Sequence, residues 1–157
     1  MFSTGHETLL RLTEYSPHLE ARIEDINSRI EPNGRTKLYD TILVALSTLS
    51  RAERRGVPRA AWAVVLTDGD DNASRADDGK VQAVLRRLWA EEPRYGLIVI
   101  GLGISPPMQV ILRDMARATP KGMYINADAS GDAAALDAAF GKAAEHIAAA
   151  SMVMEEM

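Results

Sequence analysis

Apolar residues in this sequence follow two patterns that alternate along the chain. Between residues 17 and 30, and again from about residue 36 to 50, they recur every three or four positions, which predicts amphipathic helices. Two runs, AAWAVVLTD at 60–68 and YGLIVIGLG at 95–103, are apolar at most positions and rich in Val and Ile. Such runs are typical of strands that are buried on both faces of a parallel sheet. Further strands are predicted at ETLLRLT, residues 7–13, and at GMYINAD, residues 122–128.

The same pattern predicts where the helices begin and which of their residues face the core. The helix that begins near Thr36 and is ended by Gly56 and Pro58 presents one apolar stripe, formed by Leu38, Ile42, Ala45, Leu46 and Leu49. After the first long run, Asp77 and Asp78 are suited to cap a helix, and Ser105 followed by Pro106 is suited to begin the next one. A closing helix is predicted from Asp132 onward. Its inward residues are expected to be Leu136, Phe140, Ala143 and Ile147.

Strands that alternate with helices predict an α/β fold. Parallel neighbours need crossover connections, so we expect a Rossmann-like, mostly parallel sheet with helices on both faces. A single domain over residues 1–150 is expected, followed by a tail or helix extension at 151–157. In open α/β sheets, ligands bind beyond the carboxyl ends of the strands. Thr67, Asp68, Gly69 and Asp70 lie where the first long strand ends, so this acidic turn is the first candidate functional site.

Composition and charge narrow the class of partner. The chain has 46% apolar and 25% charged residues, which is ordinary for a globular domain that buries one core. Its net charge of −4 argues against a nucleic-acid surface, and the basic segment RAERRGVPR at 51–59 suits a solvated helix end. The sequence has no cysteine, no apolar run long enough to span a membrane and no signal-peptide pattern. We therefore expect a soluble, cytoplasmic protein without disulfides.

An enzyme is the rival class for the acidic turn. VVLTDGDD at 64–71 can be read as the nucleophile loop of haloacid-dehalogenase-like phosphatases, in which Asp68 attacks phosphorus and Asp70 acts as acid or base. However, the acids of the later segment GDAAALD are off by one position, and the strand before Asp68 is internal rather than first. The sequence also has no Gly-x-Ser-x-Gly elbow, Walker loop or cysteine nucleophile. We therefore expect no enzymatic activity.

Two segments resemble the second and third signature motifs of von Willebrand factor A domains. They are GRTKLYDTI at 34–42 and VVLTDGDDNAS at 64–74, and the likeness continues through YGLIVIGLGIS and GMYINAD to about Ile147. The resemblance implies a metal-ion-dependent adhesion site, at which Mg²⁺ or Mn²⁺ bridges the domain to an acidic group of a partner protein. Thr36 and Asp68 correspond to the family's metal-site threonine and aspartate, and their oxygens suit hard cations. The ligand-binding residues expected around them are Gly34, Gly69, Asp70 and Asp71.

One part of the family's pattern is not found. The first motif, an Asp-x-Ser-x-Ser turn after the first strand, supplies a carboxylate and two hydroxyls to the metal, and this sequence contains no copy of it. DASGD at 128–132 is similar but follows the last strand, so we interpret it as a turn before a helix. We therefore expect the chain to begin late relative to the family and to bind Mg²⁺ or Mn²⁺ weakly. The central strand would then be missing, which leaves a homo-oligomer, strand exchange or a rearranged sheet as open outcomes.

Each candidate residue also has a structural interpretation. Thr36 can act as a helix N-cap, and Asp68 can close the local turn. Asp40 is interpreted as structural, and the histidines, which lack ligand spacing, are interpreted as surface residues: His6, His18 and His146. The expected function is a non-enzymatic protein-interaction module with a partial metal site. A scaffold or interaction domain that uses no metal is the alternative.

Overall fold

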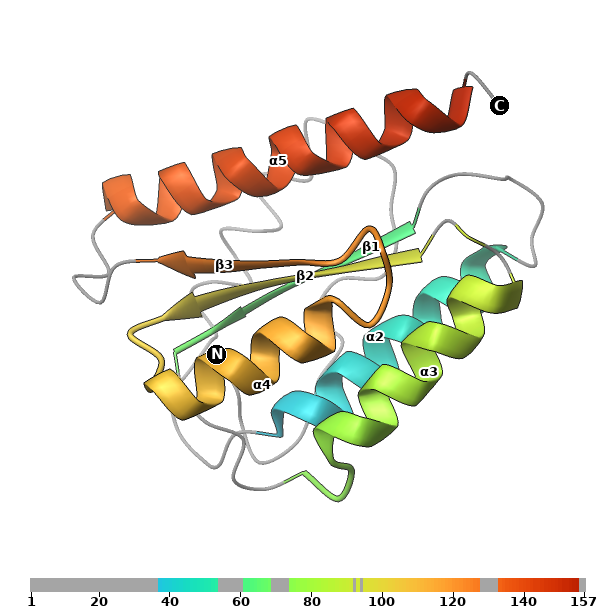
Figure 1. Cartoon of the computed structure of the whole chain (residues 1–157), viewed down its shortest axis with the longest axis horizontal. Coiled ribbons are helices and arrows are strands. Elements are labelled where there is room, and N and C mark those ends of the chain that lie inside the picture. Colours follow the sequence, from blue (N-terminus) through green and yellow to red (C-terminus); the bar gives the residue numbers. More distant parts are fainter. Residues whose placement is uncertain are drawn as a thin grey trace, which may run out of the picture.

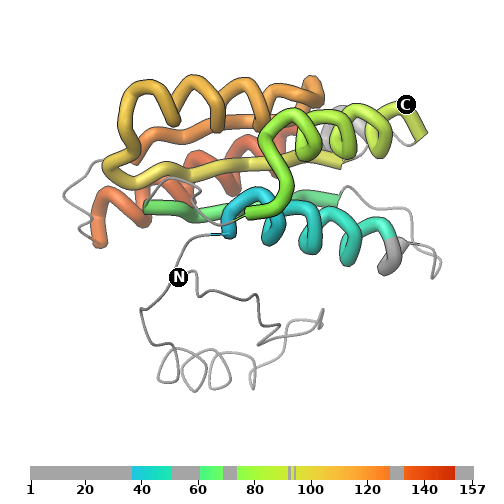
Figure 2. Tube along the Cα trace, turned by 90° about the horizontal axis from the view of Figure 1, so that it is seen from below, coloured from blue at the N-terminus to red at the C-terminus, as the bar shows by residue number. Residues whose placement is uncertain are grey.

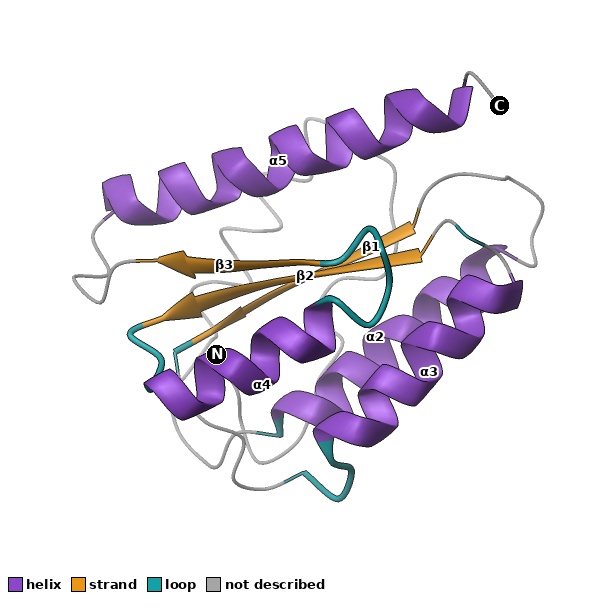
Figure 3. Ribbon diagram, viewed as in Figure 1, coloured by secondary structure: helices purple, strands orange, loops and turns teal. Residues whose placement is uncertain are grey.

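The computed structural model describes residues 37–53, 61–68, 74–91, 93, 95–127 and 133–155, with side chains described at all of these except 51–53 and 151–155. In this part of the chain, three parallel strands form one sheet in the order β1-β2-β3 (Figures 1 and 3). They are β1 at Ala61–Thr67, β2 at Tyr95–Leu102 and β3 at Met123–Ala127. The strand predicted at 7–13 and the helix predicted at 17–30 lie outside the described residues.

Within the described residues, four helices cover the two faces of this sheet. They are α2 at Leu38–Glu53, α3 at Asp78–Glu91, α4 at Pro106–Ala116 and α5 at Ala133–Glu155. Helices α2, α3 and α4 lie on one face of the sheet, and α5 lies on the other (Figure 1). Figure 2 shows the same elements seen from below. The chain thus has the predicted α/β fold, with a parallel sheet between two layers of helices.

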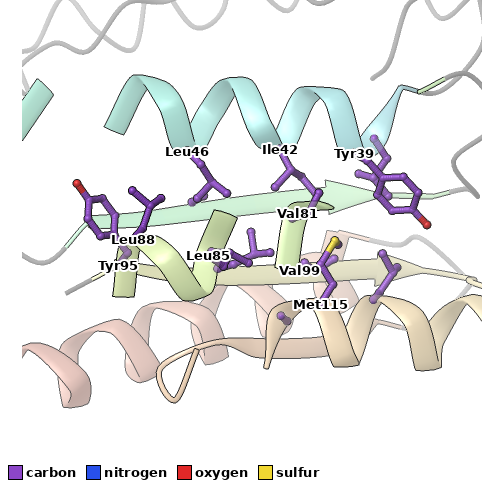
Figure 4. Close-up of a cluster of buried hydrophobic side chains, with 14 of the residues drawn as sticks. Tyr39, Ile42, Leu46, Val81, Leu85, Leu88, Tyr95, Val99 and Met115 are labelled. Atoms are coloured by element: carbon purple, nitrogen blue, oxygen red, sulfur yellow. The ribbon is translucent and has the colours of Figure 1, made fainter. Parts of the chain in front are cut away.

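The larger of the two cores lies under α2, α3 and α4. Leu38, Ile42 and Leu46 of α2 recur every fourth residue and are fully buried, which confirms the predicted stripe (Figure 4). They pack on the same cluster as Leu85 of α3 and Val99 of β2. Burial of each such aliphatic side chain stabilises the fold by about 1.5–3 kcal/mol. This layer fixes how α2 lies against the sheet, and with it the start of α2.

The two long strands differ in burial. Seven residues of β2, Tyr95 to Gly101, are buried, as the apolar run predicts. In β1, only Ala63 and Thr67 are buried, and Val64 is 42% exposed. The prediction of burial on both faces is therefore wrong for β1. The reason is its position: β1 is the outer strand of the described sheet, and α5 packs against β3 at the opposite edge.

Helix α5 packs on the sheet through small residues. Ala139 and Ala143 are buried against Ile98, Ile100 and Ile125, while Phe140 is 46% exposed. The prediction that Phe140 faces inward is therefore wrong. Two alanines four residues apart let the helix backbone approach the sheet closely, and a residue one position further along lies about 100° around the helix. Phe140 is thereby carried away from the sheet.

The helix starts at the carboxyl ends of the strands follow the predicted cap residues. Asp77 accepts a hydrogen bond from the backbone N–H of Lys80 through its Oδ1, at 2.8 Å, which confirms Asp77 as the N-cap of α3. Ser105 occupies the N-cap position of α4 without a side-chain cap bond, and Pro106 and Pro107 begin that helix. Helix α4 therefore begins shortly after β2 ends at Leu102, whereas α3 begins at Asp78, after the longer connection that follows β1.

Candidate functional site

Asp68 directly follows β1 and is exposed. Thr67, the last residue of β1, is buried and pairs in register with Gly101 of β2. Strand β1 therefore ends just before Asp68, whose carboxylate lies in solvent at the carboxyl edge where open α/β sheets bind ligands. An exposed carboxylate beside a buried strand end is available to a partner group, and its position is set by a strand that the core holds in place.

The connection from β1 to α3 is tied to α2 by one carboxylate. Asp40 accepts hydrogen bonds from the backbone N–H of Arg75, at 3.0 Å, and of Ala76, at 3.1 Å. In return, the backbone N–H of Asp40 donates to Oγ of Ser74, at 3.0 Å. These three bonds join residues that are 34 to 36 positions apart in the sequence. They fix Ser74–Ala76 against the first turn of α2.

The charge of Asp40 is stabilised by this arrangement. The backbone N–H of Arg75 and then that of Ala76 lower the pKa of the Asp40 carboxyl, and the nearby cations of Lys37 and Arg75 add to the effect. The pKa is therefore lower in the folded chain than in the unfolded one, whose carboxyl has the ordinary value of 3.8. The stabilisation is fully present above that value and is lost as the pH falls through the folded pKa.

Asp40 therefore has the structural role predicted for it. The start of α2 is also closed locally, because the carbonyl oxygen of Lys37 accepts a bond from the hydroxyl of Thr41 at 2.7 Å. The two segments that resemble separate signature motifs, 34–42 and 64–74, meet through Asp40 and Ser74 at the carboxyl edge of the sheet. A functional site at this edge would be built from both.

Only one of the predicted site residues is described. Asp68 lies at the carboxyl edge, as expected, and the other predicted positions lie outside the described residues: Gly34, Thr36, Gly69, Asp70 and Asp71. Within the described ranges, no group of three or more His, Asp or Glu side chains is placed to hold a metal ion. A single carboxylate of the type that Mg²⁺ prefers does not by itself make a metal centre. The described side chains alone therefore do not fit a bound divalent ion.

A second polar cluster was not predicted. His146 of α5 is half-buried, its Nε2 lies 2.7 Å from the carbonyl oxygen of Lys121, and its ring meets that of Trp62 edge-on at 5.5 Å. Since a carbonyl oxygen can only accept, Nε2 donates this bond. The interpretation of His146 as a surface residue is therefore wrong. It was based on sequence spacing, which does not show that α5 brings His146 against Trp62 of β1 and the carbonyl of Lys121. His6 and His18 lie outside the described residues.

Ser74 is the contributor at the carboxyl edge that sequence reasoning missed. Its hydroxyl accepts a hydrogen bond from the backbone N–H of Asp40, a residue 34 positions away in the sequence. The available signal was the pair of motif-like segments, which placed Asp40 and Ser74 in different parts of one predicted site. A pairing between them could have been proposed from that resemblance, although spacing alone does not indicate it.

Comparison with known proteins identifies the fold. No protein-family model matches the sequence, and no curated protein sequence matches it. Among solved structures, the VWA domain of SpRpn10 matches with a TM-score of 0.54 and 15% identity, over 79% of this chain and 59% of that one. The chain thus spans less than two thirds of that structure. The likeness shows that this chain has the fold of von Willebrand factor A domains.

None of the described helices combines the length and the apolar composition that crossing a bilayer demands.

Proposed function

We propose that this chain is a non-enzymatic protein-interaction module that recognises its partner at the carboxyl edge of the sheet. The observation that carries the proposal is the exposed carboxylate of Asp68 at the end of β1, in a von Willebrand factor A-like fold. The Asp40 network supports it, because a binding edge must hold its connecting segments in place. Asp68 is the residue that we expect to contact the partner or a bridging ion.

The finer proposal is that recognition uses a divalent cation. In a form of the protein with a complete ligand set, Asp68 and Thr36 would supply two oxygen ligands to Mg²⁺ or Mn²⁺, and an acidic partner group would supply another. Gly34, Gly69, Asp70 and Asp71 would surround that group. Because no group of three or more His, Asp or Glu side chains in the described part of the chain is placed to hold an ion, the affinity of this chain for it is expected to be weak.

A titration with Mn²⁺ tests the ion proposal. Paramagnetic broadening of ¹⁵N-labelled protein reports weak sites that calorimetry misses, and it should begin at the amides next to Asp68. The variant Asp68→Asn should lose this broadening. Asp137→Asn, which changes an exposed carboxylate on α5, should keep it. Broadening that is equal in both variants, or centred on α5, would contradict the proposal.

A metal-independent interaction module is the second candidate. One observation favours it: Asp40 holds Ser74–Ala76 at the edge of the sheet, and the three hydrogen bonds that do so are made by protein groups alone. Partner enrichment from the producing cells distinguishes the two. If a partner protein is lost both in EDTA and with Asp68→Asn, recognition through a bridging ion is supported. If it is lost with Asp68→Asn but kept in EDTA, direct contact with Asp68 is supported. Retention in both cases would contradict a role for Asp68.

A further inference from the structure

A groove lies between α2 and α3, away from the carboxyl edge of the sheet. It has a volume of about 300 Å³. Leu43 of α2 and Val84 and Leu88 of α3 supply apolar surface, and the polar groups at its rim are Ser47, Ser50 and Arg87. The two helices run side by side in Figure 1, and Leu88 joins Leu46 in the buried cluster of Figure 4. The groove is therefore apolar at its base and hydrogen-bonding at its rim.

The rim is suited to an oxyanion. Ser47 and Ser50 are three residues apart on α2, so their hydroxyls lie on one side of that helix, and Arg87 faces them from α3. A guanidinium binds a carboxylate with two parallel hydrogen bonds, which an ammonium cannot do. The Nε of Arg87 lies 3.9 Å from Oε1 of Glu91, but both side chains are about two-thirds exposed, at 67% and 66%. An exposed pair of this kind contributes little and is readily exchanged for a ligand carboxylate.

Charge along the chain favours an acidic ligand here. The protein as a whole has a net charge of −4. Beside the groove, however, the described charged side chains are two adjacent exposed arginines of α3, Arg86 and Arg87, and one acid, Glu91. The guanidinium of Arg87 at the groove therefore attracts negative charge and repels basic segments.

We propose that this groove binds an acidic peptide segment of a partner protein, with a bulky apolar side chain in the groove and a neighbouring carboxylate on Arg87. The inference rests on the proposed function as an interaction module and adds a second surface to it. The groove residues lie in the later turns of α2 and α3, whereas both helices begin at the carboxyl edge of the sheet. The groove and Asp68 can therefore be tested independently.

The test uses the whole chain, labelled with ¹⁵N, in EDTA so that no divalent ion contributes. The probe is the peptide N-acetyl-Leu-Glu-Leu-amide, and its partner probe carries Gln in place of Glu. Amide shifts should map to Ser47, Ser50 and Arg87 and should saturate. The Gln peptide should bind about fivefold more weakly, because it loses the charge-assisted pair with the guanidinium.

Two adjacent arginines supply a matched control. Arg86 and Arg87 are both exposed on α3, but only Arg87 lines the groove, whereas the guanidinium of Arg86 donates to Gln82 at 2.9 Å. The variant Arg87→Gln should weaken binding of the Glu peptide by about fivefold, and Arg86→Gln should leave it unchanged. Ser50→Trp, which fills the groove, should abolish it.

Several results would overturn the proposal. They are the absence of saturable shifts at the groove, equal affinity for the Glu and Gln peptides, and equal effects of the two arginine variants. Asp68→Asn distinguishes this proposal from the main one, because it should leave peptide binding intact. If Asp68→Asn abolished the shifts, the peptide would bind at the carboxyl edge, and the groove proposal would be wrong while the proposed function stood.

Discussion

The strands β1 and β2 look alike in the sequence and differ in the fold. Both are apolar runs rich in Val or Ile, and they pair in register over Ala61–Thr67 and Tyr95–Gly101. Yet β2 lies between two strands and two helix layers, while β1 is the outer strand of the described sheet and exposes Val64. An apolar run thus predicts which residues can be buried. Whether they are buried depends on the strands and helices that pack beside the run. The exposed carboxylate of Asp68 directly follows the less buried strand.

The largest expected effect comes from a matched pair of valines. Val99→Ala in β2 removes two methyl groups from a fully buried site and should lower the free energy of unfolding by about 2 kcal/mol, from lost burial and the resulting cavity. Val64→Ala in β1 should change it by less than about 0.5 kcal/mol, because that side chain is 42% exposed. Urea unfolding followed by tryptophan fluorescence measures both. Equal losses would show that β1 is covered as fully as β2.

The contact between the two strands can be broken at a glycine. The ring of Trp62 on β1 lies over Gly96 of β2, where an added Cβ would overlap the ring. We expect Gly96→Ala to destabilise the fold by about 1–3 kcal/mol, since Trp62 must shift from its place beside His146. Gly141→Ala on α5 is the control, because nothing lies near its added Cβ, and it should stabilise by about 0.5–1 kcal/mol. If both substitutions destabilised the fold, the loss would come from a change in backbone conformation and not from overlap with the ring of Trp62.

The connection after β1 should be sensitive to acid through Asp40. Because the pKa of Asp40 is lowered by the N–H groups of Arg75 and Ala76, its stabilisation should be constant above about pH 4 and fall at lower pH. Asp40→Asn should be less stable at neutral pH and should lose part of this acid-dependent decrease. Thermal unfolding between pH 2.5 and 7 measures it, with Asp137→Asn as the control. An unchanged acid profile in Asp40→Asn would contradict the assigned hydrogen bonds.

The smallest effect is expected at the aromatic side chain that faces outward from α5. Phe140→Ala should change the free energy of unfolding by less than about 0.5 kcal/mol, because Phe140 is exposed and alanine is a better helix former. The neighbouring substitution Ala139→Leu should destabilise by about 1–3 kcal/mol, since it pushes the helix away from the sheet. A large loss for Phe140→Ala would show that this ring is covered by another surface.

Much of the described fold could be predicted from periodicity. The stripe of α2, the capping residue Asp77 and the three strands were all predicted, because each depends on neighbours within a few positions. The exposure of Val64 and Phe140 could not be predicted, since it depends on where α5 lies across the sheet. A helix that packs through Ala139 and Ala143 gives a weak hydrophobic signal, and the large Phe140 dominates it.

The position of the candidate site could be predicted from the sequence, but the hydrogen bonds around it could not. Asp68 was placed at the carboxyl edge because it ends an apolar run, and this position is confirmed. The bonds that the Asp40 carboxylate accepts from Arg75 and Ala76 could not be predicted, because both donors are backbone N–H groups that no motif marks. Metal binding by Thr36 and Asp68 stays a prediction.

Site-specific photocross-linking tests the central claim most directly. A photoreactive residue replaces Arg75, whose exposed side chain lies at the carboxyl edge and whose backbone N–H still bonds Asp40. The same residue replaces Phe140 on the opposite layer as a control. The account predicts a cross-link to a discrete partner protein from position 75 in the producing cells, none from position 140, and its loss with Asp68→Asn. The same cross-links from both positions, or persistence with Asp68→Asn, would contradict recognition at this edge.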